Sequence, residues 1–467
     1  MKTLPQVTAT PEQLPLVSQN RLGVEVIRGA AGSGKTSTAL LRLRSLCFMF
    51  AARRARQNDS TPVRVLVLTF NRTLAGYVRS LAEHQIAPSI AVDLRIDTFS
   101  RWAMTELGFP AVGNDAAKAE LRRLASHIKG LAADYIIKEV EYLLGRFEPS
   151  NLELYMSTER TGRGLLPRVE SPVRRRILDE VVYPYLQWLD ESEVLDWNLV
   201  ALQMAQRPQS LDYDVVVIDE SQDFSANQLR AVRAHLAQEH AATFVIDTVQ
   251  RIYARGFTWT EAGFDVRPER VHTLRANHRN TVEIATFAAG VLNGIGVDGD
   301  GVLPNLAGAT SRGPKPVVIS GLYNEQVEWA LDYIANSVDL TTDSVAFLKP
   351  QAGKWFAYIK ARLRSRRIQY ADITREADWP QGPENVALST FHSAKGLEFD
   401  HVIILGFNDE NTPFVDAAMD DEVFVLRRLL AVAIARARKS VVVGYKPGSE
   451  SALVQYFAAG TFDGVTL

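Results

Sequence analysis

Seven short runs of β-branched and other apolar residues, each bounded by polar or turn residues, recur along the chain. They begin at residues 24 (VEVIRG), 63 (VRVLVLTF), 215 (VVVID), 243 (TFVID), 386 (VALST), 402 (VIILGF) and 441 (VVVGY). Helical stretches separate them. Near-continuous apolar strands that alternate with helices are typical of parallel sheets buried on both faces. The pattern therefore predicts an α/β protein.

The interval from about residue 110 to 210 has a different pattern. It is rich in Ala, Leu, Glu and Arg, as in AAKAELRRLASHIKGLAADYIIKEVEYLL, and its apolar residues recur at helical spacing. Strand-like runs are few there. We therefore expect a helical insertion within the first α/β domain.

Composition narrows the class of protein. The 467 residues are 46% hydrophobic and 23% charged, as in a well-cored protein of two to four domains. The single cysteine, Cys47, has no partner for an internal disulfide, and the N-terminus has no apolar signal segment. No window approaches the eighteen or so apolar residues of a membrane span. We expect a cytoplasmic protein without a membrane partner.

The net charge of the chain and the distribution of its arginines say little about its binding partners. The formal net charge is −2, and arginines cluster at residues 53–56, 174–176 and 362–367. Such clusters are usually solvated helix faces. Clustering by itself therefore gives no argument for nucleic acid.

The segment GAAGSGKT follows the strand-like run VEVIR and opens a helical stretch. Glycines in such a loop let backbone N–H groups wrap a phosphate at a helix N-terminus, Lys35 reaches the outer phosphates and Thr36 offers a hydroxyl to Mg²⁺. The alternative is a Gly-rich turn that binds nothing, which the strand-loop-helix context disfavours. The predicted nucleotide-binding residues are Gly29, Ala30, Ala31, Gly32, Ser33, Gly34, Lys35, Thr36 and Ser37.

The stretch VVVIDESQDF, from Val215 to Phe224, has two readings. It is either only a buried strand ending in an acidic turn, or the strand that holds the metal of the nucleotide. Mg²⁺ usually takes one or two protein ligands, and α/β sheets bind ligands at the carboxyl ends of their strands. With a P-loop upstream, we expect Asp219 to hold Mg²⁺ with Thr36, and Glu220 to polarise the attacking water.

Four motifs together resemble a known family. AGSGKT, DESQD, FHSAKGLEFD at 391–400 and RRLLAVAIARAR at 427–438 appear in the order found in UvrD/Rep-like superfamily 1 DNA helicases. HSAKGLEF is the most specific of them, because a generic P-loop ATPase has no reason to carry it. The resemblance implies two RecA-like, parallel-sheet P-loop domains that clamp ATP with Mg²⁺ between them and move along single-stranded DNA.

The resemblance also implies roles for particular residues. Gln13 would read adenine, Gln222 and Gln250 would sense the γ-phosphate, and Glu398 would contact the nucleotide sugar. Arg279 and Arg436 would reach the γ-phosphate from the second domain. By itself Arg436 reads as one more surface arginine, and only its place before the run at 441 favours the catalytic role. With Lys35, Asp219 and Glu220, the expected catalytic set includes Gln250, Arg279 and Arg436.

A DNA track is implied in the same way. Single strands are held by grooves with aromatic platforms on which bases stack. The expected DNA contacts are Phe70, Asn71, Thr98, Phe99, Tyr253, Arg255 and His392. Considered alone, Phe99 is more typical of a core residue. Arg255 stands where the family commonly has Trp, and Arg can also stack on a base.

The interval between Arg279 and His392 is too short for the further subdomain that processive relatives insert there. The expected organisation is therefore a first RecA-like domain split over 1–108 and 209–275, a helical lobe at 109–208 and a second RecA-like domain at 276–467.

Two functions of different class remain. The first is an ATP-dependent 3′–5′ DNA helicase or translocase that acts on single-stranded or tailed duplex DNA. The second is a DNA-sensing regulatory ATPase subunit of a nuclease-containing complex, such as an antiphage system, with little unwinding of its own. A P-loop enzyme for small molecules is disfavoured by HSAKGLEF and the paired glutamines.

Overall fold

The first sheet has six parallel strands in the order β3-β2-β4-β5-β1-β6. We describe them in a computed structural model that covers residues 9–29, 32–85, 90–159, 169–247, 257–295, 309–350, 355–374, 376, 378–412 and 420–467. The strands are β1 (Gly23–Gly29), β2 (Val63–Thr69), β3 (Val92–Thr98), β4 (Tyr213–Ile218), β5 (Leu236–Asp247) and β6 (Val271–Leu274).

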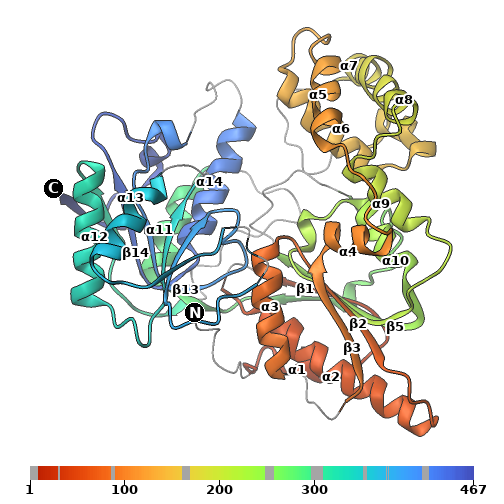
Figure 1. The fold of residues 1–467 in the computed structure, drawn as a ribbon, viewed down its shortest axis with the longest axis horizontal. Coiled ribbons are helices and arrows are strands. Elements are labelled where there is room, and N and C mark those ends of the chain that lie inside the picture. Colours follow the sequence, from red (N-terminus) through yellow and green to blue (C-terminus); the bar gives the residue numbers. More distant parts are fainter. Residues whose placement is uncertain are drawn as a thin grey trace.

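Both faces of this sheet are covered (Figure 1). Val215 and Val217 of β4 share a core with α2 (Lys35–Arg56) and α3 (Arg72–Gln85). Val216 and Ile218 face the other way and pack with α4 (Phe99–Glu106), α9 (Trp197–Ala205) and α10 (Ala226–Ala234). Because successive side chains of a strand point to opposite faces, a sheet between two helical layers needs an unbroken apolar strand.

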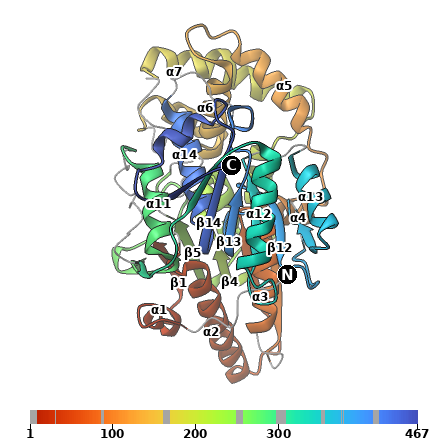
Figure 2. The same cartoon turned by 90° about the vertical axis from the view of Figure 1, so that its left-hand side faces the viewer.

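The second sheet has seven parallel strands in the order β11-β12-β10-β13-β14-β9-β15. Figure 2 shows this sheet with β12, β13 and β14 labelled. They are β9 (Val317–Ser320), β10 (Val345–Lys349), β11 (Tyr370–Asp372), β12 (Val386–Thr390), β13 (Phe399–Ile404), β14 (Ala437–Tyr445) and β15 (Asp463–Thr466). Helices α11 (Val282–Leu292) and α14 (Asp420–Ile434) share one core with the sheet, and α12 (Tyr323–Ser337) and α13 (Trp355–Ser365) share another. A small ladder joins β7 (Asn277–Thr281) to β8 (Ala309–Ser311).

A helical lobe lies apart from both sheets, at the upper right in Figure 1. It contains α5 (Asn114–Ala125), α6 (Ala133–Arg146), the 3-10 segment η1 (Pro149–Met156), α7 (Ser171–Ile177), a π turn η2 (Leu178–Val182) and α8 (Tyr183–Glu191). Its apolar residues, among them Leu121, Leu143 and Leu178, form a separate core. At its base Val112 bridges Leu195, and the Gly113 N–H donates to the Leu195 carbonyl at 3.1 Å.

The predicted α/β class with two parallel sheets is confirmed, and each of the seven apolar runs overlaps a strand. Most buried residues of α9 lie in the core of the first sheet, and Leu199 of the same helix packs against the lobe's core, whose buried residues end in α8. We propose the three-part domain division with boundaries near those expected from the sequence. Within the described ranges, no helix is long and apolar enough to cross a membrane.

Candidate active site between the two sheets

The P-loop joins β1 to α2. Gly32 and Gly34 have φ angles of +84° and +76°, in the left-handed region that favours glycine. A Cβ added at Gly34 would lie 2.4 Å from Nε2 of Gln13, so the loop also lacks room for a larger residue. Ala30 and Ala31 lie outside the described residues. The loop ends at a helix N-terminus, where backbone N–H groups favour an anion.

Three strand ends of the first sheet meet at this loop. Thr36 Oγ1 donates to Asp219 Oδ2 at 2.9 Å, directly after β4. Lys35 Nζ lies 3.0 Å from Asp247 Oδ2 at the end of β5. Burial, with the neighbouring Glu220 carboxylate, raises the pKa of Asp219. Within the described ranges no group of three or more His, Cys, Asp and Glu is placed to hold a metal. Thr36 and Asp219, the two residues expected to hold Mg²⁺, are in direct contact.

Glu220 adopts a left-handed backbone with φ +54°, which is uncommon outside glycine and aims its side chain at the loop. Gln222, in the short turn η3 (Ser221–Asp223), donates to the Glu220 carboxylate. Its carbonyl oxygen accepts from the backbone N–H of Asp247 at 3.0 Å. Gln222 therefore ties the carboxylate after β4 to the end of β5.

Lys395 comes from the second domain and is only 1% exposed. It forms an ion pair with Asp223, and its Nζ lies 3.4 Å from Glu220 Oε2. Burial by itself would lower the pKa of Lys395, but the carboxylates of Asp223 and Glu220 raise it to about 12. Asn71 of the first domain donates to the backbone carbonyls of His392 and Lys395 at 3.2 and 3.4 Å. The 392–395 segment is therefore fastened to the first domain.

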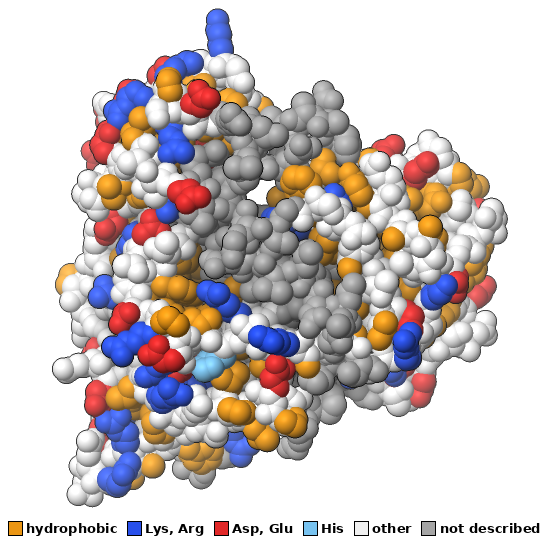
Figure 3. Space-filling view, turned by 180° about the vertical axis from the view of Figure 1, so that it is seen from behind, with side chains coloured by type: hydrophobic (Ala, Val, Ile, Leu, Met, Phe, Trp, Pro, Cys, Tyr) orange, Lys and Arg blue, Asp and Glu red, His pale blue; other side chains and the backbone are white. Residues whose placement is uncertain are grey.

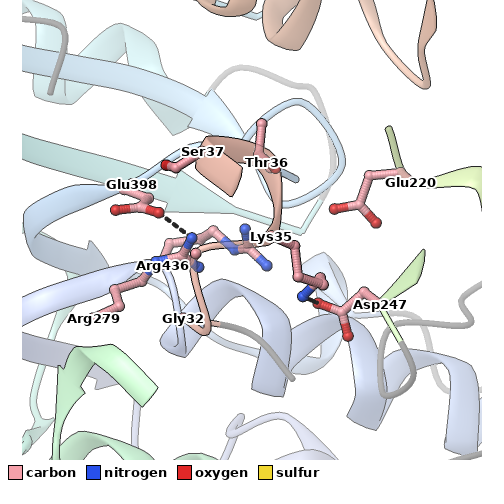
Figure 4. A pocket seen from close by; sticks show the side chains of 11 residues that line it. Gly32, Lys35, Thr36, Ser37, Glu220, Asp247, Arg279, Glu398 and Arg436 are labelled. Atoms are coloured by element: carbon pink, nitrogen blue, oxygen red, sulfur yellow. Dashed lines mark hydrogen bonds and ion pairs between the residues drawn. The ribbon is translucent and has the colours of Figure 1, made fainter. Parts of the chain in front are cut away.

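Two arginines of the second domain point toward the P-loop (Figure 4). Arg279 forms an ion pair with Glu398. Burial would raise the pKa of Glu398, but the charge of Arg279, with smaller contributions from Arg438 and Arg436, lowers it. Burial and the nearby Arg279 lower the pKa of Arg436 to about 10, which leaves this guanidinium charged at neutral pH.

These groups line one pocket. Arg279 Nε and Arg436 Nη2 are buried there without an acceptor among the described residues. A buried guanidinium N–H without a partner is costly, and an anionic ligand would satisfy both. The lining residues are Gly32, Gly34, Lys35, Thr36, Ser37, Glu220, Asp247, Arg279, Gly396, Glu398 and Arg436.

Gln13 lies beside this pocket and is buried. Its Nε2 donates to the Ser33 carbonyl at 3.3 Å, and its Oε1 accepts from the Thr10 N–H at 3.0 Å. Ser33 of the P-loop is buried as well, and Gly29 ends β1. The structure thus brings Gln13 to the P-loop, and its adenine-reading role stays a prediction.

The residues expected on the DNA track have varied surroundings. Lys395 Nζ lies 5.3 Å from the centroid of the Phe70 ring, and Thr98 caps α4 by accepting from the Arg101 N–H. Phe99 is buried with its ring edge-on to Trp102 and Phe224, so it has no free face for a base. We leave Phe99 out of the proposed track.

His392 is partly buried, and burial with the charge of Lys395 lowers its pKa. Neutral imidazole is therefore the form that this surface presents at neutral pH. Gln250, Tyr253 and Arg255 lie outside the described residues, so their placement stays a prediction.

Sequence reasoning missed four residues of the site. Asp247 carried a signal, because it ends the apolar run TFVID as Asp219 ends VVVID. Gly396 and Lys395 lie inside the HSAKGLEF motif, but nothing local indicates what they approach. The pairing of Lys395 with Asp223 spans 172 positions and is visible only in the folded chain.

The predicted arginine clusters are partly neutralised on the surface. Arg175 pairs with Glu153, Arg176 with Glu180 and Arg366 with Glu328. Seen from behind, basic side chains are interspersed with acidic ones over the described surface (Figure 3). The face seen in Figure 3 therefore gives no argument for DNA binding from its charge.

Comparison with known proteins agrees with this geometry. The model of the UvrD/REP helicase N-terminal domain matches residues 9–258, and that of the UvrD-like helicase C-terminal domain matches residues 363–447. The ATP-dependent DNA helicase Rep of Buchnera aphidicola subsp. Schizaphis graminum (strain Sg) is 42% identical over 64 residues, which are 14% of this chain and 10% of that protein.

Among solved structures, the C-terminal domain of a possible DNA helicase from Lactobacillus plantarum WCFS1 is 23% identical, with a TM-score of 0.30. The match covers 40% of this chain and 97% of that one. This score is too low to carry an argument about fold. The ranges matched by the two family models contain residues of the site. The first range contains the P-loop and Glu220, and the second contains Lys395, Glu398 and Arg436. The chain belongs to the UvrD/REP helicase family.

Proposed function

We propose that the chain hydrolyses ATP in the pocket between its two sheets and uses the resulting domain movement to travel 3′ to 5′ along single-stranded DNA, unwinding tailed duplexes. One observation carries the proposal. Arg279 and Arg436, from the second domain, meet the P-loop and Glu220 of the first in a single pocket.

The groups present fit a nucleotide with its metal. The P-loop glycines and Lys35 would hold the phosphates, and Gln13 would read the base. Thr36 and Asp219 would hold Mg²⁺, because their paired oxygens are the hard ligands that this cation prefers. Bound there, Mg²⁺ would offset the negative charge of the phosphate oxygens.

Glu220 would accept the proton of the attacking water, and the two arginines would stabilise charge that develops on the γ-phosphate. Because both arginines belong to the second domain, hydrolysis would require the domains to close. Gln222 supports coupling, since it contacts both Glu220 and the backbone of Asp247.

Movement on DNA is supported by the family and by a relative named as an ATP-dependent DNA helicase. Phe70, Asn71, Thr98 and His392 would form part of the track, joined by Gln250, Tyr253 and Arg255. The 3′ to 5′ direction and the preference for single strands rest on the resemblance of the motifs.

The test is strand displacement on matched duplexes with a 3′ or a 5′ tail, with ATP hydrolysis measured with and without single-stranded DNA. We expect displacement of the 3′-tailed duplex and faster hydrolysis when DNA is present. If the rate of ATP hydrolysis were the same with and without DNA and neither duplex were displaced, the proposed movement along DNA would be wrong. DNA-stimulated hydrolysis without displacement would instead favour the regulatory ATPase.

A further inference from the structure

The chain passes from the first sheet to the second domain through Arg275 and Ala276. Strand β6 ends at Leu274, which pairs with Gly29 at the start of the P-loop, and β7 begins at Asn277. We call residues 275–276 the crossing. Since Arg279 follows it within three residues, a small rotation at the crossing moves the Arg279 guanidinium relative to the P-loop.

Space between the P-loop and β7 is tight. A Cβ added at Gly32 would lie 2.2 Å from Oδ1 of Asn277 and 2.9 Å from the Cβ of Arg279. Asn277 Oδ1 also accepts from the N–H groups of Arg279 and Asn280, each at 3.1 Å. Strand β7 is therefore stiff, and the direction of Arg279 is set where the strand begins.

One side chain holds the crossing from outside. Glu12 Oε1 accepts from the Arg275 N–H at 2.8 Å, and Glu12 Oε2 lies 3.4 Å from the Ala276 nitrogen. Hydrogen bonds to a carboxylate are stronger than those between neutral groups. Both backbone N–H groups of the crossing thus point at a single carboxylate.

Glu12 belongs to the turn that also carries Gln13. The turn is closed by the Gln13 N–H, which donates to the Thr10 carbonyl at 2.9 Å. From this turn, Gln13 contacts the P-loop at Ser33 while Glu12 contacts the crossing. Two successive side chains therefore connect the nucleotide loop to the link between the domains.

We propose that Glu12 is a positioning residue: it clamps the crossing so that the turn beside the nucleotide base sets the angle at which Arg279 enters the pocket. The inference rests on the proposed ATP hydrolysis. Glu12 itself lines no part of the pocket, so its effect on the reaction passes through Arg279.

The test compares Glu12→Ala and Glu12→Gln with the unchanged full chain, by kcat and KM for ATP hydrolysis and by equilibrium binding of a fluorescent ATP analogue. Misplacement of a catalytic group by about 1 Å can cost up to ~10²-fold in rate, so we expect Glu12→Ala to lower kcat by about 10-fold. Analogue affinity should change by less than about threefold, because the P-loop and Gln13 remain. Glu12→Gln should lie between, since its amide oxygen accepts only one of the two N–H groups.

A matched control is Glu269→Ala. Glu269 is an exposed carboxylate in the short turn η4 (Pro268–Arg270), just before β6. Its removal should leave kcat unchanged. A similar loss of kcat in both variants would mean that any lost carboxylate in this region suffices, and would overturn the specific role of Glu12.

A double variant separates positioning from general stability. If Glu12 acts through Arg279, adding Glu12→Ala to Arg279→Ala should cause no further loss of kcat, whereas independent effects would multiply. Amide hydrogen exchange can be measured in the absence of nucleotide. The backbone amides of Arg275 and Ala276 should exchange faster in Glu12→Ala than in the unchanged chain. Unchanged exchange rates would refute the clamp. A wild-type chain that hydrolyses no ATP would overturn the proposed function. Normal hydrolysis in Glu12→Ala would overturn the positioning role alone.

Discussion

The Glu220 carboxylate both faces the pocket and is held by neighbouring side chains. It faces the pocket for the proposed reaction, and it is held from behind by Gln222 and Lys395. A residue held in this way keeps its direction while water and nucleotide exchange in front of it. The left-handed backbone at Glu220 is the local strain that this placement requires.

Replacing Glu220 by Gln tests its role as proton acceptor. The amide preserves size and the contact with Gln222 but cannot take a proton, and general-base catalysis is worth about 10²–10⁴-fold in rate. We therefore expect ATP turnover to fall at least about 100-fold while affinity for a fluorescent ATP analogue stays within a few-fold. Turnover near the wild-type rate would mean that another group accepts the proton.

Lys395 tests how a buried charge pair supports the site. Lys395→Met would leave the Asp223 carboxylate buried without its cation, and breaking a buried pair costs about 3–5 kcal/mol. We expect the thermal midpoint, followed by circular dichroism, to fall by about 5 °C or more. Adding Asp223→Asn should recover part of the loss. Exposed Lys315 provides the control, because Lys315→Met should shift the midpoint little; an equal shift would argue against the buried pair.

Among the elements, β13 and β14 carry a polar network in the first half of both strands. His401 Nδ1 lies 2.7 Å from Ser440 Oγ, and His401 Nε2 lies 3.2 Å from Asp343 Oδ2. Burial lowers the pKa of His401, although Asp343 counters the effect. The imidazole is therefore neutral in the folded protein at pH values where it would already be charged in the unfolded chain.

The lowered pKa of His401 makes the stability of the folded protein depend on pH. Below the ordinary His pKa of about 6.5, the unfolded chain binds a proton that the folded chain does not, so stability falls as pH falls, by at most about 1.4 kcal/mol per pH unit for one group. We expect His401→Gln to flatten the decline of the thermal midpoint between about pH 6.5 and 5. Because burial also lowers the pKa values of His235 and His392, some slope should remain. An unchanged slope would show that His401 does not contribute.

Sequence pattern recovered most of the buried strands, although β10, VAFLK, is buried along its whole length and was not among the seven runs. The central strands β2 and β4 were evident because both of their faces are covered, which forces an apolar run. The edge strand β3, VDLRIDT, was missed because one side of it meets solvent and tolerates Asp and Arg. The short strands β11 and β15 lie at the edges of the second sheet and were missed for the same reason.

The candidate site was recovered for a different reason. Lys35, Thr36, Glu398 and Arg436 lie in motifs whose spacing is local, and the pocket brings them together. Lys395 with Asp223, and Glu12 with the crossing, depend on how two domains approach each other. Such contacts leave no periodicity or spacing in a single sequence.

Considered as a whole, the molecule places its two parallel sheets so that neither completes the pocket alone. The first contributes the P-loop, Glu220 and Asp247, and the second contributes Arg279, Glu398 and Arg436. In the proposed reaction, the arginines would stabilise charge on the phosphate only when the two domains are together. The rate of hydrolysis would then depend on domain closure.

Arg279→Ala tests whether the rate of ATP hydrolysis depends on an arginine from the second domain. An arginine that stabilises the transferring phosphate is worth about 10³–10⁵-fold in rate, so we expect kcat to fall by at least about 100-fold with little change in KM or in binding to single-stranded DNA. Arg312, an exposed arginine paired with Glu283, serves as the matched control, and Arg312→Ala should hydrolyse ATP normally. If KM rose instead and kcat held, Arg279 would contribute ground-state binding only.

The bridge between Val112 and Leu195 has a consequence for how this architecture can vary. The chain enters and leaves the helical lobe at two points that are hydrogen-bonded neighbours in a parallel bridge. A tight turn cannot join parallel neighbours, so the connection between them has to be longer, but lengthening such a connection further costs little loop-closure entropy. The length and outer surface of the lobe can therefore change without altering the strand order of the sheet beneath it, as long as the base of the lobe is kept, where Asn227 donates to the carbonyls of Leu144 and Phe147.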